Sequence, residues 1–163
     1  MCDCAVHEQE KQLMRQAIEL SREKMIAGFG GPFGAVIARN GKVIATGFNQ
    51  VTSANDPTAH AEVSAIRAAC QALNTFDLSG CEIYTSCEPC PMCLSAIYWA
   101  RLDRIYYANS RQDAADIGFD DAFLYEEIDK DIPDRQIPTI RLLEKEAILP
   151  FNEWRAKPDK IAY

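Results

Sequence analysis

Apolar and polar residues alternate along this chain with two different periods, and the period changes several times. Over residues 8–27, apolar residues recur near helical spacing among charged ones, at Leu13, Ala17, Ile18, Leu20 and Met25. This pattern predicts an amphipathic helix. Two β-rich runs follow at residues 33–39 and 42–48, separated by Asn40-Gly41, a strong hairpin signal. These two strands are expected to pair antiparallel.

The rest of the chain alternates helical and strand-like segments. A helix is predicted at residues 59–73, with Asp56 or Thr58 as its cap. Two strand-helix-strand crossovers in succession imply parallel pairing of those strands and right-handed connections. The further predicted elements are strands at 82–86, 104–108 and 139–143 and helices at 91–100, 110–116, 120–129 and 150–157. We therefore predict an α/β fold, a mixed five-stranded sheet with helices on both faces.

Length and composition indicate one domain in a reducing compartment. A chain of 163 residues with 48% hydrophobic composition can bury a sizeable core but is short for two domains. The polar N-terminus lacks a signal-peptide core, and no segment approaches 18 uninterrupted apolar residues. The seven cysteines are odd in number and partly clustered, which favours metal ligation over disulfides. A cytoplasmic protein that does not span a membrane is expected.

The net charge argues against a nucleic acid partner. It is −7, with a pI near 4.8, whereas binding a phosphate backbone depends largely on Lys and Arg. Arg101, Arg104 and Arg111 lie close in sequence and could form a local basic groove. Their alternative interpretation is a solvated face. A small molecule is the expected substrate.

The most specific motif is His60-Ala61-Glu62 followed by Pro89-Cys90-Pro91-Met92-Cys93. It supplies three zinc ligands, His60, Cys90 and Cys93, and a carboxylate that is not a ligand, in the order typical of zinc-dependent nucleobase deaminases. Three protein ligands leave the fourth position of a tetrahedral zinc open for water, whereas structural sites are closed. Glu62 stands two positions after His60, so both can face the metal only if His60 lies at the irregular entry to its helix.

Cys87 leaves alternatives open at this site. Cys87, Cys90 and Cys93 stand at three-residue spacing, which resembles part of an iron–sulfur pattern or could close the zinc site with a fourth thiolate. Cys87 could equally be a buried thiol near the site. If Cys87 were a ligand, the chain would be a zinc-binding interaction module without catalysis.

Glycines and aromatic residues add candidate contacts for a flat ligand. The run from Gly30 to Gly34 lacks the Lys-Ser/Thr ending of a phosphate loop and indicates a helix-ending turn or a close approach of the backbone to the site. Phe33, Phe48 and Trp99 would ordinarily belong to the core. Any of them that bordered the zinc could stack on a base.

Together these residues resemble the cytidine deaminase superfamily, and in particular the small bacterial zinc-dependent guanine deaminases. The resemblance rests on the segments Gly30-Gly31-Pro32-Phe33-Gly34-Ala35-Val36-Ile37, Asn55-Asp56-Pro57-Thr58-Ala59-His60-Ala61-Glu62-Val63, Tyr84-Thr85-Ser86-Cys87-Glu88-Pro89-Cys90-Pro91-Met92-Cys93, Ala96-Ile97-Tyr98-Trp99-Ala100-Arg101 and Gly118-Phe119-Asp120-Asp121. It implies a three-layer α/β/α cytidine-deaminase-like fold over a single domain, residues 1–163. It also implies a homodimer that exchanges C-terminal segments, about residues 145–163.

The resemblance also implies the substrate contacts. Asn49 should contact the base, Asp121 should recognise the guanine edge, and Tyr163 should close the pocket of the partner subunit; Ala61 is a further substrate-binding position. A carboxylate suits guanine because N1–H and the 2-amino group are adjacent donors, which adenine and cytosine lack. Asp120 and Asp121 could alternatively cap a helix.

The implied reaction is hydrolysis of guanine to xanthine and ammonia, a step of purine catabolism. Zinc lowers the pKa of its water from about 15.7 towards about 7, and Glu62 moves protons from the water to the base and the departing amine. Guanosine and aminotriazines are the alternative substrates within the same chemistry. Adenosine in tRNA and cytosine in a nucleic acid are disfavoured by the charge.

Overall fold

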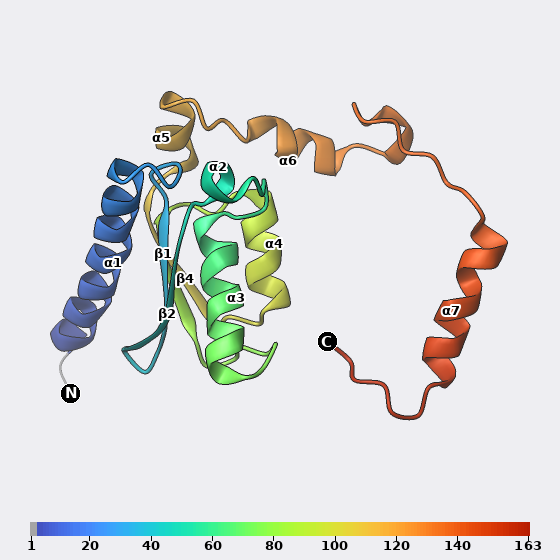
Figure 1. The fold of residues 1–163 in the computed structure, drawn as a ribbon, viewed down its shortest axis with the longest axis horizontal. Helices are drawn as coiled ribbons and strands as arrows, with labels where there is room; N and C mark the ends of the chain where they lie inside the picture. The colour runs from blue at the N-terminus through green and yellow to red at the C-terminus, as the bar shows by residue number, and fades with distance from the viewer. Residues whose placement is uncertain (1–2) are drawn as a thin grey trace. The chain divides into compact units, whose positions relative to one another are not determined.

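The computed structural model describes the backbone of residues 3–163 and the side chains from Glu8 onward. Its strands are β1 (Gly34–Arg39), β2 (Lys42–Phe48), β3 (Glu82–Cys87) and β4 (Arg104–Asn109). Its helices are α1 (Asp3–Ile26), α2 (Val51–Ala54), α3 (Ala61–Leu73), α4 (Pro91–Trp99), α5 (Arg111–Asp116), α6 (Ala122–Asp129), the 3-10 helix η1 (Ile132–Asp134) and α7 (Glu144–Ala156). The chain divides into two compact units, Met1–Asp121 and Ala122–Tyr163, each of which is described by itself (Figure 1).

The first unit is built on a mixed sheet with strand order β2-β1-β3-β4. The β1–β2 hairpin is antiparallel, as predicted, and Asn40 and Gly41 at its turn have φ of 51° and 72°. Both values suit the type I′ turn that Asn-Gly favours. Strand β3 pairs antiparallel with β1 and parallel with β4. The expected α/β fold with a mixed sheet is confirmed for this unit.

Two predictions about the sheet are wrong. Strands β2 and β3 do not pair directly, because β1 lies between them and is antiparallel to both. They still run in the same direction, so the crossover through α3 is preserved. The sheet has four strands instead of five, because residues 139–143 form no strand. The alternation of Ile140 and Leu142 resembles a strand locally, but a strand also needs an edge with which to pair.

Helices cover both faces of the sheet, as predicted (Figure 1). Because side chains alternate along a strand, Val36 and Ala38 of β1 pack in one core cluster with Leu13 and Ala17 of α1. Ile18 and Met25 of the predicted apolar stripe are exposed instead. On the opposite face, the core cluster contains residues of β1, α3, β3 and α4 and of the loops beside them: Ala35, Ile37, Ala61, Ala65, Ala69, Leu78, Cys81, Ile83, Ile97 and Ala100.

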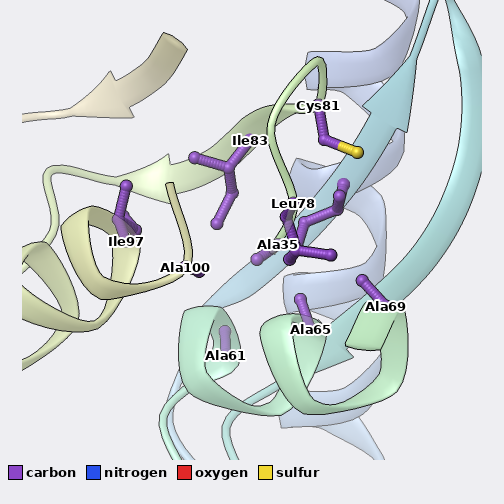
Figure 2. Close-up of a cluster of buried hydrophobic side chains, with 10 residues drawn as sticks. Ala35, Ala61, Ala65, Ala69, Leu78, Cys81, Ile83, Ile97 and Ala100 are labelled. Carbon is purple, nitrogen blue, oxygen red and sulfur yellow. The ribbon is translucent and has the colours of Figure 1, made fainter. Parts of the chain in front are cut away.

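Small residues set how closely α3 lies on the sheet. Ala61, Ala65 and Ala69 recur every four residues along one side of α3, which faces the core (Figure 2). Gly47 of β2 lies against the start of this helix, where an added Cβ would overlap the carbonyl oxygen of Ala61 and the amide nitrogen of Ala65. The helix therefore approaches the strand at backbone contact distance.

The second unit has helices but no buried side chain of its own across residues 122–163, all of which the structure describes. Its exposed apolar side chains include Ile148, Leu149, Phe151 and Trp154 of α7. This helix begins at Glu144, earlier than the predicted start at residue 150, and Pro150 lies inside it. A proline costs little in the first turn of a helix, whereas inside a helix it removes one backbone hydrogen bond. In the described part of the chain, none of the helices is long and apolar enough to cross a membrane.

The close approach at Gly47 can be tested by substitution. Gly47→Ala should lower the free energy of unfolding by about 1–3 kcal/mol, because the new methyl group must push α3 away from β2. Thr46→Ala, at the exposed neighbouring position of the same strand, is the matched control and should cost less than about 1 kcal/mol. Urea denaturation of both variants measures the difference, and equal stabilities would contradict this account of the packing.

Candidate metal centre

Two helix starts bring the candidate ligands together. The carboxyl ends of β2 and β3 lead to α3 and α4, and those strands run in the same direction. His60 is the N-cap of α3, with extended φ and ψ of −68° and 159°, and Cys90 is the N-cap of α4, at −64° and 167°. Neither side chain caps its own helix, so both are available to a ligand. The irregular entry that the sequence required of His60 is therefore present.

The three predicted ligands have the spacing that zinc needs. The Nδ1 atom of His60 lies 3.5 Å from Sγ of Cys90 and 3.5 Å from Sγ of Cys93. All three ligand atoms lie within 4.8 Å of one another. A tetrahedral zinc with bonds of about 2.0–2.1 Å to nitrogen and about 2.3 Å to sulfur holds such atoms about 3.6 Å apart. One imidazole and two sulfurs at this spacing fit zinc.

The side chains around Cys90 favour its thiolate form. The Cys93 thiol donates a hydrogen bond to the sulfur of Cys90, which together with His60 lowers the pKa of Cys90 to about 4 despite burial. The same hydrogen bond, together with burial, raises the pKa of Cys93. Cys90 also raises the pKa of His60. A metal cation binds the thiolate and the neutral imidazole, so its binding must release the proton of Cys93 and competes with protonation of His60.

Glu62 lies beside the three ligands in the first turn of α3. Its side chain is buried, with 6% of the residue exposed, and burial raises the pKa of its carboxyl group. The carboxyl group interacts with the Cys93 thiol, and its Oε1 atom lies 3.4 Å from the hydroxyl oxygen of Thr85. A carboxyl group held in an apolar setting next to a metal site is suited to accept and return a proton.

Cys87 is directed to a different partner. It ends β3, and its Sγ atom lies 3.5 Å from the carbonyl oxygen of Ser110. Burial raises the pKa of its thiol to about 11, the reverse of the change at Cys90. Among the described residues, the group with metal-ligand spacing contains His60, Cys90 and Cys93 without Cys87. This geometry favours the interpretation of Cys87 as a buried thiol near the site.

The other two described cysteines, Cys70 and Cys81, lie in or against the core and not in this group. Cys81 is buried in the core, and Cys70 packs against the same cluster. The side chains of His7, Cys2 and Cys4, which the sequence indicated as surface, terminal or core residues, lie outside the described ones.

Asn49 is held in a fixed orientation near the metal ligands. It is buried directly after β2, and its Oδ1 atom accepts hydrogen bonds from the backbone N–H groups of Gly31 (3.3 Å) and Val51 (3.2 Å). The next residue, Gln50, donates its N–H to the carbonyl oxygen of Ala59, which precedes His60. Because the amide oxygen is used by the backbone, the amide NH₂ group is the part of Asn49 that can donate to a ligand.

An aromatic pair connects the glycine turn to the segment that carries Asp121. The rings of Phe33 and Phe119 meet edge to face, with centroids 4.9 Å apart, and pack beside Gly31. Asp121 follows two residues after Phe119, and burial and then the charge of Cys90 raise the pKa of its carboxyl group. Asp121 is thus within electrostatic range of the metal ligands.

Three other predicted contacts lie in different places. Ala61 is fully buried at the start of α3 and belongs to the core cluster. Trp99 ends α4, about 13 Å along the helix axis from Cys90, and is exposed in a shallow surface depression with Ser95, Tyr98 and Arg101. Tyr163 is exposed at the end of the second unit.

Sequence reasoning missed two residues of this region, Thr85 and Phe119. The alternation of β3 could have indicated Thr85, because it shares the face of Ile83, which lies in the core beside α3. Phe119 belongs to the Gly-Phe-Asp-Asp segment, but its contact with Phe33 joins parts of the chain far apart in sequence. No local pattern predicts such a contact.

Comparisons with known proteins agree with this geometry. The family described as the cytidine and deoxycytidylate deaminase zinc-binding region matches residues 7–109. The chain is 53% identical to guanine deaminase of Bacillus subtilis (strain 168) over 150 residues, 92% of this chain and 96% of that protein. It is 49% identical to tRNA-specific adenosine deaminase of Agrobacterium fabrum over 76 residues, 47% of this chain and 50% of that protein.

Solved structures of guanine deaminases also match this chain. The X-ray structure of guanine deaminase from Bacillus subtilis matches with a TM-score of 0.91 and 52% identity, covering 94% of this chain and 98% of that one. A guanine deaminase structure from Nitrosomonas europaea matches with a TM-score of 0.65 and 37% identity, covering 68% of this chain and 64% of that one. With its ligands at zinc spacing, the chain belongs to the cytidine and deoxycytidylate deaminase zinc-binding family.

Proposed function

We propose that this chain is a guanine deaminase, a zinc-dependent hydrolase that converts guanine and water to xanthine and ammonia. The observation that carries the proposal is the reach of its similarity to a guanine deaminase, which covers 92% of the chain and therefore extends beyond the metal ligands. The similarity to a tRNA-specific adenosine deaminase covers 47%. The acidic balance of the chain, −7, also favours a free base over RNA.

In this proposal Glu62 is the proton carrier. When held by His60, Cys90 and Cys93, zinc with an open position supplies a Lewis acid that activates water at neutral pH. Glu62 takes a proton from that water and delivers protons to the ring nitrogen and to the departing amine. Its burial supports this role because a raised pKa makes the carboxylate a stronger base for taking the proton.

Asn49 and Asp121 recognise the base in this proposal. The Asn49 amide oxygen is occupied by two backbone N–H groups, so its NH₂ group faces ring acceptors of the purine. The Asp121 carboxylate accepts from N1–H and the 2-amino group, two adjacent donors beside the carbon that water attacks. The electrostatic coupling between Asp121 and Cys90 supports a place for that carboxylate near the reacting carbon. Phe33 contributes a ring to the pocket wall.

The second unit supports a dimer with exchanged C-terminal segments. We propose that residues 1–163 form a single domain whose segment at about 145–163 packs on a second copy, where Tyr163 closes the pocket. A segment that buries none of its own apolar side chains needs another surface to cover them.

We propose a cytoplasmic location and a role in purine catabolism. Thiol ligands suit a reducing cytoplasm, and xanthine and ammonia are products of purine breakdown.

The substrate prediction is tested by measuring ammonia release from guanine, guanosine, adenine, cytosine and cytidine with the zinc-loaded protein. Guanine should give the highest kcat/KM, because it alone among the free bases offers the donor pair that Asp121 accepts and needs no space for ribose. Glu62→Gln should retain zinc and lose at least about 10²-fold in kcat. Preference for guanosine or adenine, or an active Glu62→Gln protein, would contradict the proposal.

Segment exchange is tested by mixing two inactive variants. Deletion of residues 161–163 should lower activity on guanine by removing Tyr163 from the partner subunit's pocket, while Glu62→Gln inactivates its own subunit. A mixed dimer then contains one complete site, so unfolding and refolding the variants together should restore about a quarter of wild-type activity. No recovery in mixtures that form mixed dimers would show that Tyr163 serves its own subunit.

A further inference from the structure

A buried residue of β3, Thr85, contacts the carboxyl group of Glu62 through its hydroxyl group. Thr85 is 2% exposed and Glu62 is 6% exposed, so water has little access to either side chain. The Thr85 Oγ1 atom lies 3.4 Å from Oε1 of Glu62 and 2.9 Å from the carbonyl oxygen of Cys87. Hydrogen bonds at catalytic groups are often long in unliganded enzymes and shorten when substrate binds.

The backbone around Thr85 is held on both sides. Thr85 lies opposite Ala35 of β1 and Tyr107 of β4, so it stands in a central strand of the sheet. Its side chain shares the α3 face with Ile83, because alternate residues of a strand point to the same face. Threonine is also β-branched, which restricts rotation about its first side-chain torsion. The hydroxyl group is therefore a fixed point next to a longer, more flexible glutamate.

A hydroxyl group has the chemistry that this position requires. The Cys87 carbonyl oxygen and Oε1 of Glu62 both lie within donor distance of the Thr85 hydroxyl, which has one proton to donate. By rotation the hydroxyl can donate to either oxygen, and when it donates to Cys87 its own oxygen can accept from a protonated Glu62. Valine has nearly the same shape but offers neither a donor nor an acceptor. A hydroxyl can therefore remain a hydrogen-bond partner of the carboxyl group in both of its protonation states.

We propose that Thr85 is a positioning residue that holds the Glu62 carboxyl group in the orientation needed for proton transfer. The Thr85 hydroxyl contacts the carboxyl group from the strand side. Fixing Oε1 on the strand restricts rotation of the carboxyl group about its last torsion. The inference rests on the proposed role of Glu62, and Thr85 acts through Glu62 without touching the base.

The test compares Thr85→Val with Thr85→Ser on guanine, using zinc-loaded protein. Thr85→Val should lower kcat by about 10–100-fold, the usual effect of losing a partner that orients a group at a metal site, while KM and zinc content stay within about twofold. Thr85→Ser keeps the hydroxyl and should recover kcat to within about threefold of wild type. A kcat of Thr85→Val within twofold of wild type would overturn the proposal.

Ser86→Ala is the matched control for losing a buried hydroxyl from the same strand. Ser86 is also 2% exposed, but its Oγ accepts from the N–H of Gly34 instead of contacting Glu62. The kcat of Ser86→Ala should stay within about threefold of the wild-type value even if the melting temperature of the variant falls. If Thr85→Val fails to fold, Thr85→Ser and Thr85→Ala decide the matter, because both are smaller than threonine and only one keeps the hydroxyl; equal kcat values would overturn the proposal.

Glu62→Gln separates failure of this inference from failure of the proposed function. If Thr85 acts through Glu62, then adding Thr85→Val to Glu62→Gln should change the residual rate by less than about twofold, because the two effects are not additive. A further tenfold loss would overturn the positioning role alone. An active Glu62→Gln protein would instead overturn the role assigned to Glu62, whatever Thr85→Val does.

Discussion

The geometry of the zinc site is the constraint on which the rest of the structure depends. A nitrogen and two sulfurs must lie about 3.6 Å from one another, although His60 and Cys90 are separated by thirty positions in the chain. Strands β2 and β3 run in the same direction, so α3 and α4 both begin at the same end of the sheet. Gly47 and the alanines of α3 then set the distance between that helix and the sheet.

The same packing creates the chemical setting of the site. Since α3 begins at backbone contact distance from β2, Glu62 in its first turn is enclosed against β3 and has little access to water. Burial raises the pKa of Glu62, while hydrogen bonds from neighbouring ligands lower that of Cys90. A proton carrier and a metal-binding thiolate thus lie side by side with opposite shifts. Each shift has a local cause in the first turn of a helix or in the strand beside it.

The sequence predicted the parts of this arrangement that depend on local pattern. The Asn40-Gly41 hairpin, the start of α4 and the irregular helix entry at His60 follow from residues within a few positions. The predicted cap of α3 at Asp56 or Thr58 is wrong, because His60 itself is the N-cap. The features that the sequence did not predict depend on contacts between segments far apart in the chain. Strand β1 lies between β2 and β3, and residues 139–143 do not pair with the sheet. The contact of Thr85 with Glu62 likewise joins two segments that only the fold brings together. Periodicity indicates which face a residue occupies but not its neighbour across the core.

The most direct test of the account is X-ray absorption spectroscopy at the zinc edge of the purified, zinc-loaded protein. The spectrum should show two sulfur ligands at about 2.3 Å and two nitrogen or oxygen ligands at about 2.0 Å, namely Cys90, Cys93, His60 and one exchangeable water. Addition of a tight-binding guanine analogue should alter only the nitrogen and oxygen shell. Three sulfur ligands would instead mean that Cys87 closes the site, and would contradict the open, catalytic zinc centre.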